Sequence, residues 1–401
     1  MSARRILLAD ADAFYVSVAR LVDPGGAGAS PLLIVGGSPE RRGVVTSASY
    51  EARAYGVTSA MPMARAVRLC PGALVVPVPW DACVEKGEEI RAVLERFTPV
   101  VERASSDEFY LDLSGTERLY KGEPLEATAG RIRAEVAAAT RLSMSIGGGT
   151  SKLVAKLAAG RAKPRAGAAG AGVRVVGAGA EEAFLREFAL ADLPGVGPRF
   201  QEELARYGLR EVTDALRHDA KTLEAWLGAR AGRWLFDRIR GIDPSEVDAG
   251  GEAKSISRDE TFAKDLDDAA ALDRELRALA GRAAADLRAS GLQARTVTVR
   301  IRDADFTDRQ ASRTLPAPVL SDRAILTTAR DLLARLRAAR PVPARLLSVG
   351  LTQLVREGTP DQLTLFEASG PGPETERDRT LSRIVDRLRD RFGPDAAGWG
   401  R

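Results

Sequence analysis

Two adjacent carboxylates, Asp107 and Glu108, have types and a spacing that suggest chemistry. Phe109, Tyr110 and Leu111 follow them and favour a pleated, half-buried strand. Because successive side chains of a strand leave on opposite faces, a turn or bulge at Asp107 is needed to direct both acids to one place. Like charges repel, so such a pair suits a site that holds a cation. The alternative at this point is a hairpin tip with two solvated acids.

A third acid, Asp10, ends an apolar run over residues 6–10 that we expect to form a buried strand. Together with the acid pair it would supply three carboxylates to one site. Hard oxygen ligands of this kind suit Mg²⁺, which takes its other ligands from water and substrate phosphates. A pair of such ions around a phosphoryl centre is the usual design of polymerases and nucleases. The alternative is that Asp10 caps a helix that begins at Ala13.

Three cationic or hydroxyl-bearing residues suit an anionic phosphate. Tyr50 and Arg53 lie three positions apart on an expected helical turn and therefore share a face. A guanidinium binds phosphate through strong, charge-assisted hydrogen bonds. Lys163 is followed by Pro164 at the end of an expected helix, where a lysine can reach phosphate as a point charge. The alternative is that these are ordinary surface side chains.

The segment 193–198, Leu-Pro-Gly-Val-Gly-Pro, precedes an expected helix over residues 199–207. Gly195 and Gly197 permit a tight turn whose backbone N–H groups can hold a phosphate at the helix N-terminus. This pattern is typical of a helix-hairpin-helix, which contacts nucleic acid independently of its sequence. A plain helix–helix turn is the alternative.

A short apolar peptide lies in a polar C-terminal region. An exposed peptide of this kind is unfavourable unless it docks on a surface, either that of a partner or that of its own domain. Its residues are Gln362, Leu363, Leu365 and Phe366.

The composition indicates a globular protein of several domains. A chain of 401 residues is long enough for about two to four domains. Its two cysteines provide no disulfide framework and no metal-ligand cluster, so we expect a reducing, cytoplasmic location. A single histidine argues against histidine-based catalysis. No apolar run has the length of a membrane span, and the run that ends at Asp10 is too short for a signal peptide.

Basic charge is concentrated in one part of the chain. The net charge is +4, whereas residues 291–356 contain twelve arginines and five aspartates, a balance of 12 − 5 = +7. This distribution favours a polyanionic partner.

The pattern of expected elements changes along the chain. Residues 1–163 mix strands and helices, residues 181–241 are helical, and residues 252–356 follow the order β-α-β-β-α-β. A Gly/Ala-rich, low-complexity stretch covers residues 165–172. Near the C-terminus, the apolar residues between 381 and 392 recur at the spacing of an amphipathic helix.

With these motifs in this order, the chain resembles the Y-family of translesion DNA polymerases, of the DNA polymerase IV type, from about Arg5 to Phe366. Two departures are visible. The family usually continues Lys-Pro with Asn-Gly, whereas Arg165 and Ala166 stand here, and Ser49 replaces a common asparagine. The resemblance rests on residues 10–15, 48–53, 56–62 and 106–112, followed by Lys163-Pro164 and residues 194–197.

The resemblance implies a multidomain α/β and α+β fold, arranged as a right-hand polymerase. Its parts would be a ferredoxin-like palm (residues 1–13 and 79–166), small fingers (14–78), a helical thumb with the helix-hairpin-helix (178–243), a β-α-β-β-α-β little finger (252–356) and a flexible tail (357–401) with a clamp-binding peptide (362–366).

The resemblance also implies the roles of particular residues. Asp10, Asp107 and Glu108 would be catalytic and bind two Mg²⁺ ions, with the backbone carbonyl of Ala11 as a further ligand. Asp107 would bridge both ions, Glu108 would face the ion that activates the primer 3′-OH, and Asp112 would be structural. Tyr15 would be the steric gate that excludes a ribose 2′-OH. The nucleotide-binding set would be Phe14, Tyr15, Ser47, Tyr50, Arg53 and Lys163, and the DNA-binding set Gly195, Gly197, Lys254, Arg258, Arg300, Arg302 and Arg313.

The implied function is template-directed DNA synthesis on damaged templates, without proofreading, because no separate exonuclease acid cluster is visible. The implied partners are primer–template DNA, dNTP and the bacterial sliding clamp, and we expect a monomer that does not associate with membranes. One alternative is an inactive relative that binds DNA and clamp as a scaffold. Another is a different palm-type enzyme, such as a nucleotidyl cyclase.

Overall fold

The computed structural model describes residues 3–164, 170–251, 253–358, 372–393 and 396. The chain divides into two compact units, Met1–Gly251 and Glu252–Arg401. Within the described ranges, no helix is both long and apolar enough to cross a bilayer. The low-complexity stretch lies partly, and the predicted clamp-binding peptide wholly, outside the described residues.

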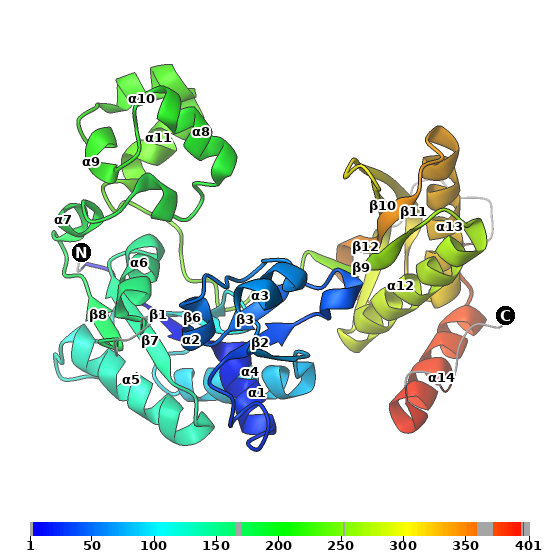
Figure 1. Cartoon of the computed structure of the whole chain (residues 1–401), viewed down its shortest axis with the longest axis horizontal. Helices are drawn as coiled ribbons and strands as arrows, with labels where there is room; N and C mark the ends of the chain where they lie inside the picture. The colour runs from blue at the N-terminus through cyan, green and yellow to red at the C-terminus, as the bar shows by residue number, and fades with distance from the viewer. Residues whose placement is uncertain (1–2, 165–169, 252, 359–371, 394–395, 397–401) are drawn as a thin grey trace. The chain divides into compact units, whose positions relative to one another are not determined.

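A five-stranded sheet forms the centre of the first unit (Figure 1). Its middle strand is buried along its whole length, because both faces of the sheet are covered. Neighbouring strands are antiparallel except for the last pair, which is parallel. The order across the sheet is β5 (Val101–Arg103), β6 (Glu108–Asp112), β1 (Ile6–Ala11), β7 (Met144–Gly149) and β8 (Val173–Val175).

Helices pack on both faces of this sheet. On one face, α4 (Trp80–Leu94) and α5 (Leu125–Thr140) form a core with Leu7 of β1. On the other face, α6 (Lys152–Ala162) packs against Leu8. Since side chains alternate along a strand, Asp10, two residues after Leu8, belongs to the α6 face.

Helix α6 approaches β7 closely at Gly147. A Cβ at this position would lie 2.0 Å from the backbone nitrogen of Ala159 and 2.1 Å from the carbonyl oxygen of Ala155. Only glycine fits here, because any side chain would collide with the helix backbone. The close packing fixes α6 over the end of the sheet that carries the acids.

Between β1 and α4, the chain forms a smaller sheet with its own core. Its middle strand pairs antiparallel with one neighbour and parallel with the other. Ser49 caps the N-terminus of the short helix over Tyr50–Arg53, because its side-chain hydroxyl accepts the N–H of Ala52. The elements of this part are α1 (Phe14–Val22), β2 (Leu33–Gly36), η1 (Pro39–Arg41), β3 (Val45–Ala48), α2 (Tyr50–Arg53), α3 (Met63–Leu69) and β4 (Leu74–Val76).

Short helices follow β8 and share one hydrophobic core. Gly195 lies in the turn before α8 with φ 98°, a left-handed conformation that favours glycine. A Cβ there would also lie 2.8 Å from the indole of Trp234. The helices are α7 (Glu181–Leu185), η2 (Leu190–Asp192), α8 (Pro198–Arg206), α9 (Val212–Ala215), α10 (Ala220–Leu227) and α11 (Ala229–Arg238).

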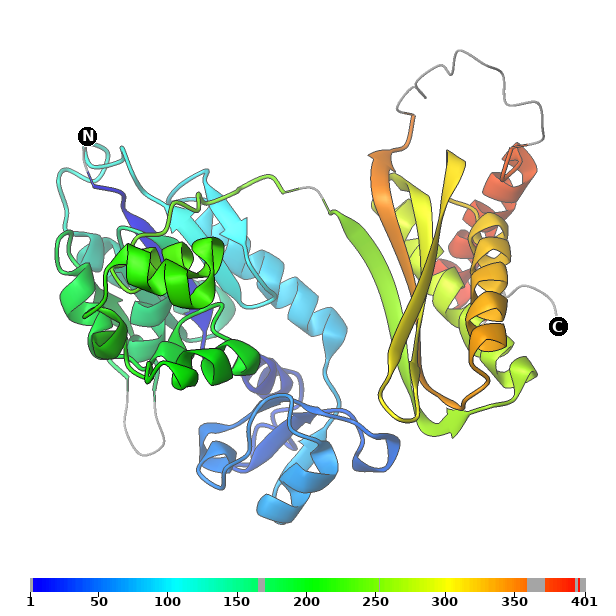
Figure 2. The same ribbon diagram turned by 90° about the horizontal axis from the view of Figure 1, so that it is seen from above.

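The second unit is a four-stranded antiparallel sheet with helices on one face, as Figure 2 shows. The order of elements along the chain is the predicted β-α-β-β-α-β. Across the sheet the strands lie in the order β11-β10-β12-β9. The elements are β9 (Ser255–Leu266), α12 (Ala269–Ala289), β10 (Leu292–Asp303), β11 (Asp308–Val319), α13 (Asp322–Ala339) and β12 (Ala344–Arg356).

Strand β11 is longer than its sequence indicates. The apolar pattern predicts a strand over residues 311–315, which ends before Pro316, but the strand continues through Pro316 and Pro318 to Val319. β11 is an edge strand, so a residue that lacks an N–H donor is tolerated on its unpaired side.

The C-terminal region contains a docked helix, α14 (Glu376–Phe392), which differs from the flexible tail expected over residues 357–401. Arg288 of α12, almost fully buried, forms ion pairs of 2.7 Å with Asp322 and 2.6 Å with Asp386 of α14. The hydroxyl of Ser382 accepts the N–H of Asp322. The apolar spacing predicts the helix, whereas the polar contacts that attach it to the sheet-and-helix unit depend on tertiary structure.

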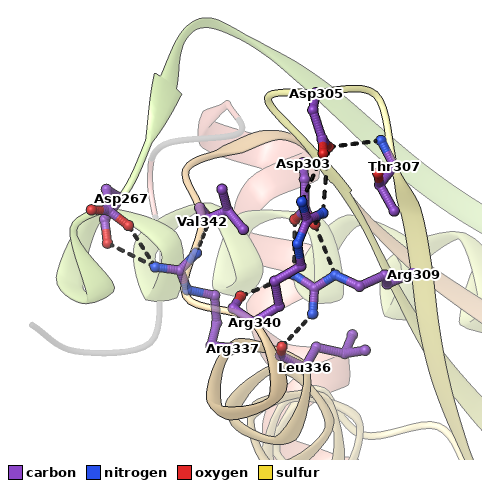
Figure 3. A network of polar contacts seen from close by, with 9 residues as sticks. All are labelled: Asp267, Asp303, Asp305, Thr307, Arg309, Leu336, Arg337, Arg340 and Val342. Carbon is purple, nitrogen blue, oxygen red and sulfur yellow. Dashed lines mark hydrogen bonds and ion pairs between the residues drawn. The ribbon is translucent and has the colours of Figure 1, made fainter.

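A charge network centred on the buried carboxylate of Asp303 joins the β10–β11 hairpin to the end of α13, as Figure 3 shows. Asp303 is fully buried and accepts two hydrogen bonds from Arg309, of 2.9 and 2.8 Å, and one of 2.7 Å from Arg340. Arg340 also bonds Asp305 at 2.7 Å, and this arginine holds the pKa of the Asp305 carboxyl below its usual range. The network thus links the hairpin to the C-terminal end of α13 at this corner of the unit.

Asp303→Asn is expected to destabilise this corner by roughly 3 kcal/mol, because removing one charge of a buried ion pair leaves its partners uncompensated. Hydrogen exchange of the full chain, read by mass spectrometry, should become faster in β10 and α13. The matched control is Asp308→Asn, which removes an exposed pair with Arg302 and should cost less than about 1 kcal/mol. Equal effects of the two variants would contradict the role given to Asp303.

Candidate active site

The acids that the sequence singles out lie at neighbouring positions on β1 and β6. Asp10 is directly opposite Glu108 in the antiparallel register, and the N–H of Ala11 donates to the carbonyl of Asp107 at 3.0 Å. Side chains at opposite positions of an antiparallel pair share one face, with Cβ atoms about 5 Å apart. Asp10 and Glu108 therefore both leave on the face that α6 covers.

Asp107 lies in the turn that precedes β6, where the sequence requires one. The hydroxyl of Ser105 accepts the N–H groups of Asp107 and Glu108, at 3.3 and 3.1 Å, and donates to the Asp107 carboxylate at 2.7 Å. The strand begins at Glu108. Because Asp107 lies in the turn and Glu108 in the strand, their side chains do not have to point to opposite faces, as consecutive residues of one strand would.

Two lysines bind the acids on the α6 face. Lys163 lies 2.6 Å from Asp10, and Lys156 bonds both oxygens of Glu108 at 2.8 Å. Sequence reasoning identified Lys163 as a phosphate ligand but missed Lys156. Lys163 follows the last residue of α6 with extended backbone angles, so helical spacing does not connect it to Lys156, and no local pattern indicates that Lys156 belongs to the site.

Burial raises the pKa of Asp10 to about 6, although Lys163 opposes this shift. The charges of Glu108 and Asp107 contribute a smaller part of the same rise in the pKa. The three acids are therefore close enough to interact, and a cation between them would be favoured. In the described part of the chain, however, no three carboxylate, histidine or cysteine side chains converge as a metal-binding group. Asp10 and Glu108 direct oxygens to lysines instead.

A fourth acid near the site, Asp12, has a structural environment. Its buried carboxylate accepts hydrogen bonds from the hydroxyls of Ser143 and Ser145. Its N–H donates to the carbonyl of Ser143 at 2.9 Å. Asp12 therefore fixes the end of β1 to β7. At the other end of β6, Asp112 accepts the N–H of the turn residue Ser114.

The chain turns from β1 into α1 through Ala13, whose φ of 44° is left-handed and uncommon for a residue with a Cβ. The turn places Tyr15 beside the acid pair. The Tyr15 hydroxyl and the hydroxyl of Ser106 are 2.7 Å apart, and the Tyr15 ring lies edge-on to Phe14 and to Trp80. Sequence reasoning missed Ser106 and Trp80, because only the fold brings them to Tyr15.

Tyr50 and Arg53 share a face of α2, as their spacing predicts. The Arg53 guanidinium lies 5.0 Å from the centre of the Tyr50 ring and donates to the carbonyl of Ala48. Burial, together with the charges of Asp12 and Asp10, raises the pKa of Tyr50 to about 12.

The Tyr50 hydroxyl is buried and has no hydrogen-bond partner among the described residues. Such an unpaired donor suits an anionic ligand. Ser47, the other hydroxyl of this set, is buried in β3. The electrostatic influence of Asp10 on Tyr50 indicates that this part of the chain faces the acids.

The residues predicted to bind DNA lie in both units. In the first unit, Gly195 forms the turn before α8, and Gly197 is the residue that caps this helix. In the second unit, Lys254 is exposed just before β9. The arginines of the second unit lie on two different faces of its sheet.

Arg300 and Arg302 lie on the open face, opposite Ser348 and Leu346 of β12. Arg258 and Arg313 lie on the helix-covered face, because their register partners Val349 and Val297 belong to the core. They pair there with Asp286 of α12 and Asp331 of α13. The sequence predicts basic strands but not the face of each arginine.

Three models of known protein families and domains match the chain. The impB/mucB/samB family matches residues 9–160, its C-terminal domain matches residues 253–365, and the thumb domain of DNA polymerase-iota matches residues 191–243. A solved structure, a Y-family DNA polymerase chimera of Dbh and Dpo4, aligns with a TM-score of 0.77 at 22% identity, over 88% of this chain and 100% of that one. This likeness confirms the predicted right-hand fold.

Curated relatives cover the chain almost completely. The DNA polymerase IV of Dehalococcoides mccartyi (strain CBDB1) is 35% identical over 100% of this chain and 98% of its own length. That of Caulobacter vibrioides is 36% identical over 98% of this chain and 92% of its own length. That of Alkalilimnicola ehrlichii is 38% identical over 91% of this chain and 100% of its own length. The chain belongs to the Y-family of DNA polymerases, in its DNA polymerase IV branch.

Proposed function

We propose that this chain is a translesion DNA polymerase that adds deoxynucleotides to a primer 3′-OH as a template directs, without proofreading. The observation that carries the proposal is the pairing of Asp10 with Glu108 across β1 and β6, with Asp107 in the adjoining turn. Family membership supports the same activity.

The acids fit divalent metal ions, because Asp10, Asp107 and Glu108 offer the oxygen ligands that Mg²⁺ prefers. Ala11 would add its backbone carbonyl. Asp107 would bridge two ions, and Glu108 would hold the one nearer the primer. When bound, such ions promote ionisation of the 3′-hydroxyl and neutralise charge on the leaving pyrophosphate.

The incoming dNTP would lie between the acids and α2. The unpaired hydroxyl of Tyr50, with Arg53 and Lys163, would bind its triphosphate, helped by Ser47 and the backbone of Phe14. The ring of Tyr15, restrained by Ser106 and by aromatic contacts, would lie against the sugar and exclude a 2′-OH.

The open face of the second unit's sheet would contact the DNA backbone. This face is rich in hydroxyls, with Thr296 bonded to Thr314 and Thr298 bonded to Ser312. Such groups and the nearby Arg300 suit phosphates without reading base sequence. In the first unit, the hairpin at Gly195 and Gly197 would hold a further phosphate through backbone N–H groups.

Arg300→Gln is expected to weaken primer–template binding about tenfold and to reduce the slope of log Kd against log salt by about one, because one phosphate contact is lost. Fluorescence anisotropy over a range of salt concentrations measures both. Arg313→Gln is the matched control: it removes the same charge from the helix-covered face and should change affinity less than about twofold. An equal loss in both variants would contradict the assignment of the open face.

Gln362, Leu363, Leu365 and Phe366, which lie outside the described residues, would dock on the sliding clamp. Replacing Leu365 and Phe366 by alanine should abolish stimulation of synthesis by the clamp, because the apolar anchors are lost. Clamp-free extension should be unchanged, and Thr364→Ala is the control within the peptide. Stimulation that survives the double substitution would refute this docking.

Primer extension with Mg²⁺ and four dNTPs tests the proposal against its rivals. A protein that binds primer–template without extending it would be the scaffold, and one that converts a nucleoside triphosphate without DNA would be a cyclase-type enzyme. The domain boundaries given above, a cytoplasmic location and a monomeric state are parts of the same proposal.

A further inference from the structure

We propose that Lys163 occupies the cation position at Asp10 when no metal is bound, and that a metal ion displaces it toward the triphosphate. Metal and nucleotide would then bind cooperatively, because each favours the same movement of one side chain. This inference rests on the proposed function, since it uses the same acids and the same nucleotide site.

Lysines in α6 and directly after it each bind an acid of the sheet below. Lys152 lies 2.6 Å from Glu102, Lys156 lies 2.8 Å from Glu108, and Lys163 lies 2.6 Å from Asp10. The separation of four residues keeps Lys152 and Lys156 on one helical face, and Lys163 follows the end of the helix. Because α6 is held against β7 at Gly147, Lys152 and Lys156 are fixed over the acids that they bind.

Asp10 needs a cation in the absence of metal. Its side chain is only 8% exposed, and an ionised carboxylate buried to this extent is unfavourable unless a charged group compensates it. Lys163 meets that requirement, because its ammonium binds the Oδ2 atom of Asp10.

Lys163 and a metal ion at this carboxylate would repel each other. A Mg²⁺ ion would lie about 2.1 Å from a ligating carboxylate oxygen, while the ammonium lies 2.6 Å from Oδ2. On one oxygen the two cations would be about 4 Å apart, a distance at which like charges still repel strongly in a partly buried site. Binding of a metal at Asp10 therefore favours the departure of Lys163.

The two lysines differ in their freedom to move. Their side chains are similarly exposed, but Lys163 follows the last residue of α6 and has extended backbone angles, so the helix does not restrain it. Its flexible four-carbon stem allows the ammonium to reach a phosphate instead. Lys156 lies inside the helix and bonds both oxygens of Glu108, so we assign it the role of a positioning residue that remains in place.

The exchange predicts opposite effects of one substitution. Without the ammonium of Lys163, a metal ion meets no competitor at Asp10 and binds more tightly, whereas the nucleotide loses a phosphate contact and binds more weakly. A lysine that only bound phosphate would change nucleotide affinity alone. Coupling between two ligands is reciprocal. Loss of the Lys163 ammonium should therefore reduce the effect of metal on nucleotide affinity and the effect of nucleotide on metal affinity by the same factor.

The test uses the full chain and Mn²⁺ alone, with the unbound ion measured by electron paramagnetic resonance. Lys163→Gln and Lys163→Met should each bind Mn²⁺ about tenfold more tightly than wild type, a factor in the usual range for coupled sites. Lys163→Arg, which keeps the charge, and Lys152→Gln, which removes an ion pair at Glu102, should match wild type. Asp10→Asn should remove the binding and so identify the site.

The second arm measures dNTP affinity on a primer that ends in a dideoxynucleotide, at saturating Mg²⁺. Lys163→Gln should weaken it about tenfold. Mn²⁺ affinity that is unchanged or lower in both neutral variants would overturn the inference. Since the Mn²⁺ arm requires no synthesis, a failure of wild type in primer extension would refute the proposed function separately.

Discussion

Asp107→Asn and Glu108→Gln should each lower single-nucleotide incorporation by about 1,000-fold, equivalent to roughly 4 kcal/mol of transition-state stabilisation. The substitutions keep the shape of each side chain and remove the charge that a metal ligand must carry. Catalysis of phosphoryl transfer depends mostly on positioning and on neutralising charge, so loss of a metal ligand affects the chemical step directly. Single-turnover kinetics with excess enzyme measure the effect.

Asp112→Asn is the matched control for these acids. It lies on the same strand, and its carboxylate accepts the N–H of Ser114 at the other end of β6, a bond that asparagine can also accept. We expect a rate within about twofold of wild type. DNA affinity should be retained in all three variants. Near-normal incorporation by Asp107→Asn or Glu108→Gln would show that the metal assignment is wrong.

Tyr15→Ala should raise ribonucleotide incorporation relative to deoxynucleotide incorporation by about 100-fold, because a shape contact that rejects one added group is worth a factor of this size. The ring lies beside the acid site, restrained by Ser106 and Trp80. The measured quantity is the ratio of kcat/KM for dCTP and CTP opposite a template guanine.

Tyr15→Phe separates the ring from its hydroxyl. It removes the hydrogen bond to Ser106 but keeps the bulk, so discrimination should remain within about tenfold of wild type. If Tyr15→Ala discriminates as well as wild type, another residue excludes the 2′-OH.

Local sequence patterns predict much of the fold. The apolar run over residues 6–10 predicts a buried strand, the strand-favouring residues 109–111 predict a second strand, and the turn required at Asp107 is present where β6 begins. The β-α-β-β-α-β order of the second unit is confirmed. These features depend on residue periodicity and turn chemistry, which a single sequence contains.

Other features depend on contacts between distant segments. Lys156 meets Glu108 only because Gly147 lets α6 lie against β7. Arg313 lies on the helix-covered face of the sheet and Arg300 on the open face. The face of Arg313 is decided by its register with β10 and by the position of α13. Register and helix packing are tertiary properties, so a charge count along the strand could not assign these arginines.

The docked helix α14 shows the same limit. Its apolar spacing predicts a helix, but its attachment requires the buried Arg288, which belongs to another helix and binds Asp386 of α14. No local pattern around either residue indicates that pair.

Single-nucleotide incorporation by the wild-type chain, opposite each of the four template bases in turn, tests the central claim most directly. With Mg²⁺ and a primed template, the complementary dNTP should be added to the primer 3′-OH in each case, and the addition should depend on the metal. A chain that binds the primed template but adds no nucleotide, or adds the same nucleotide whatever the template base, would contradict the account.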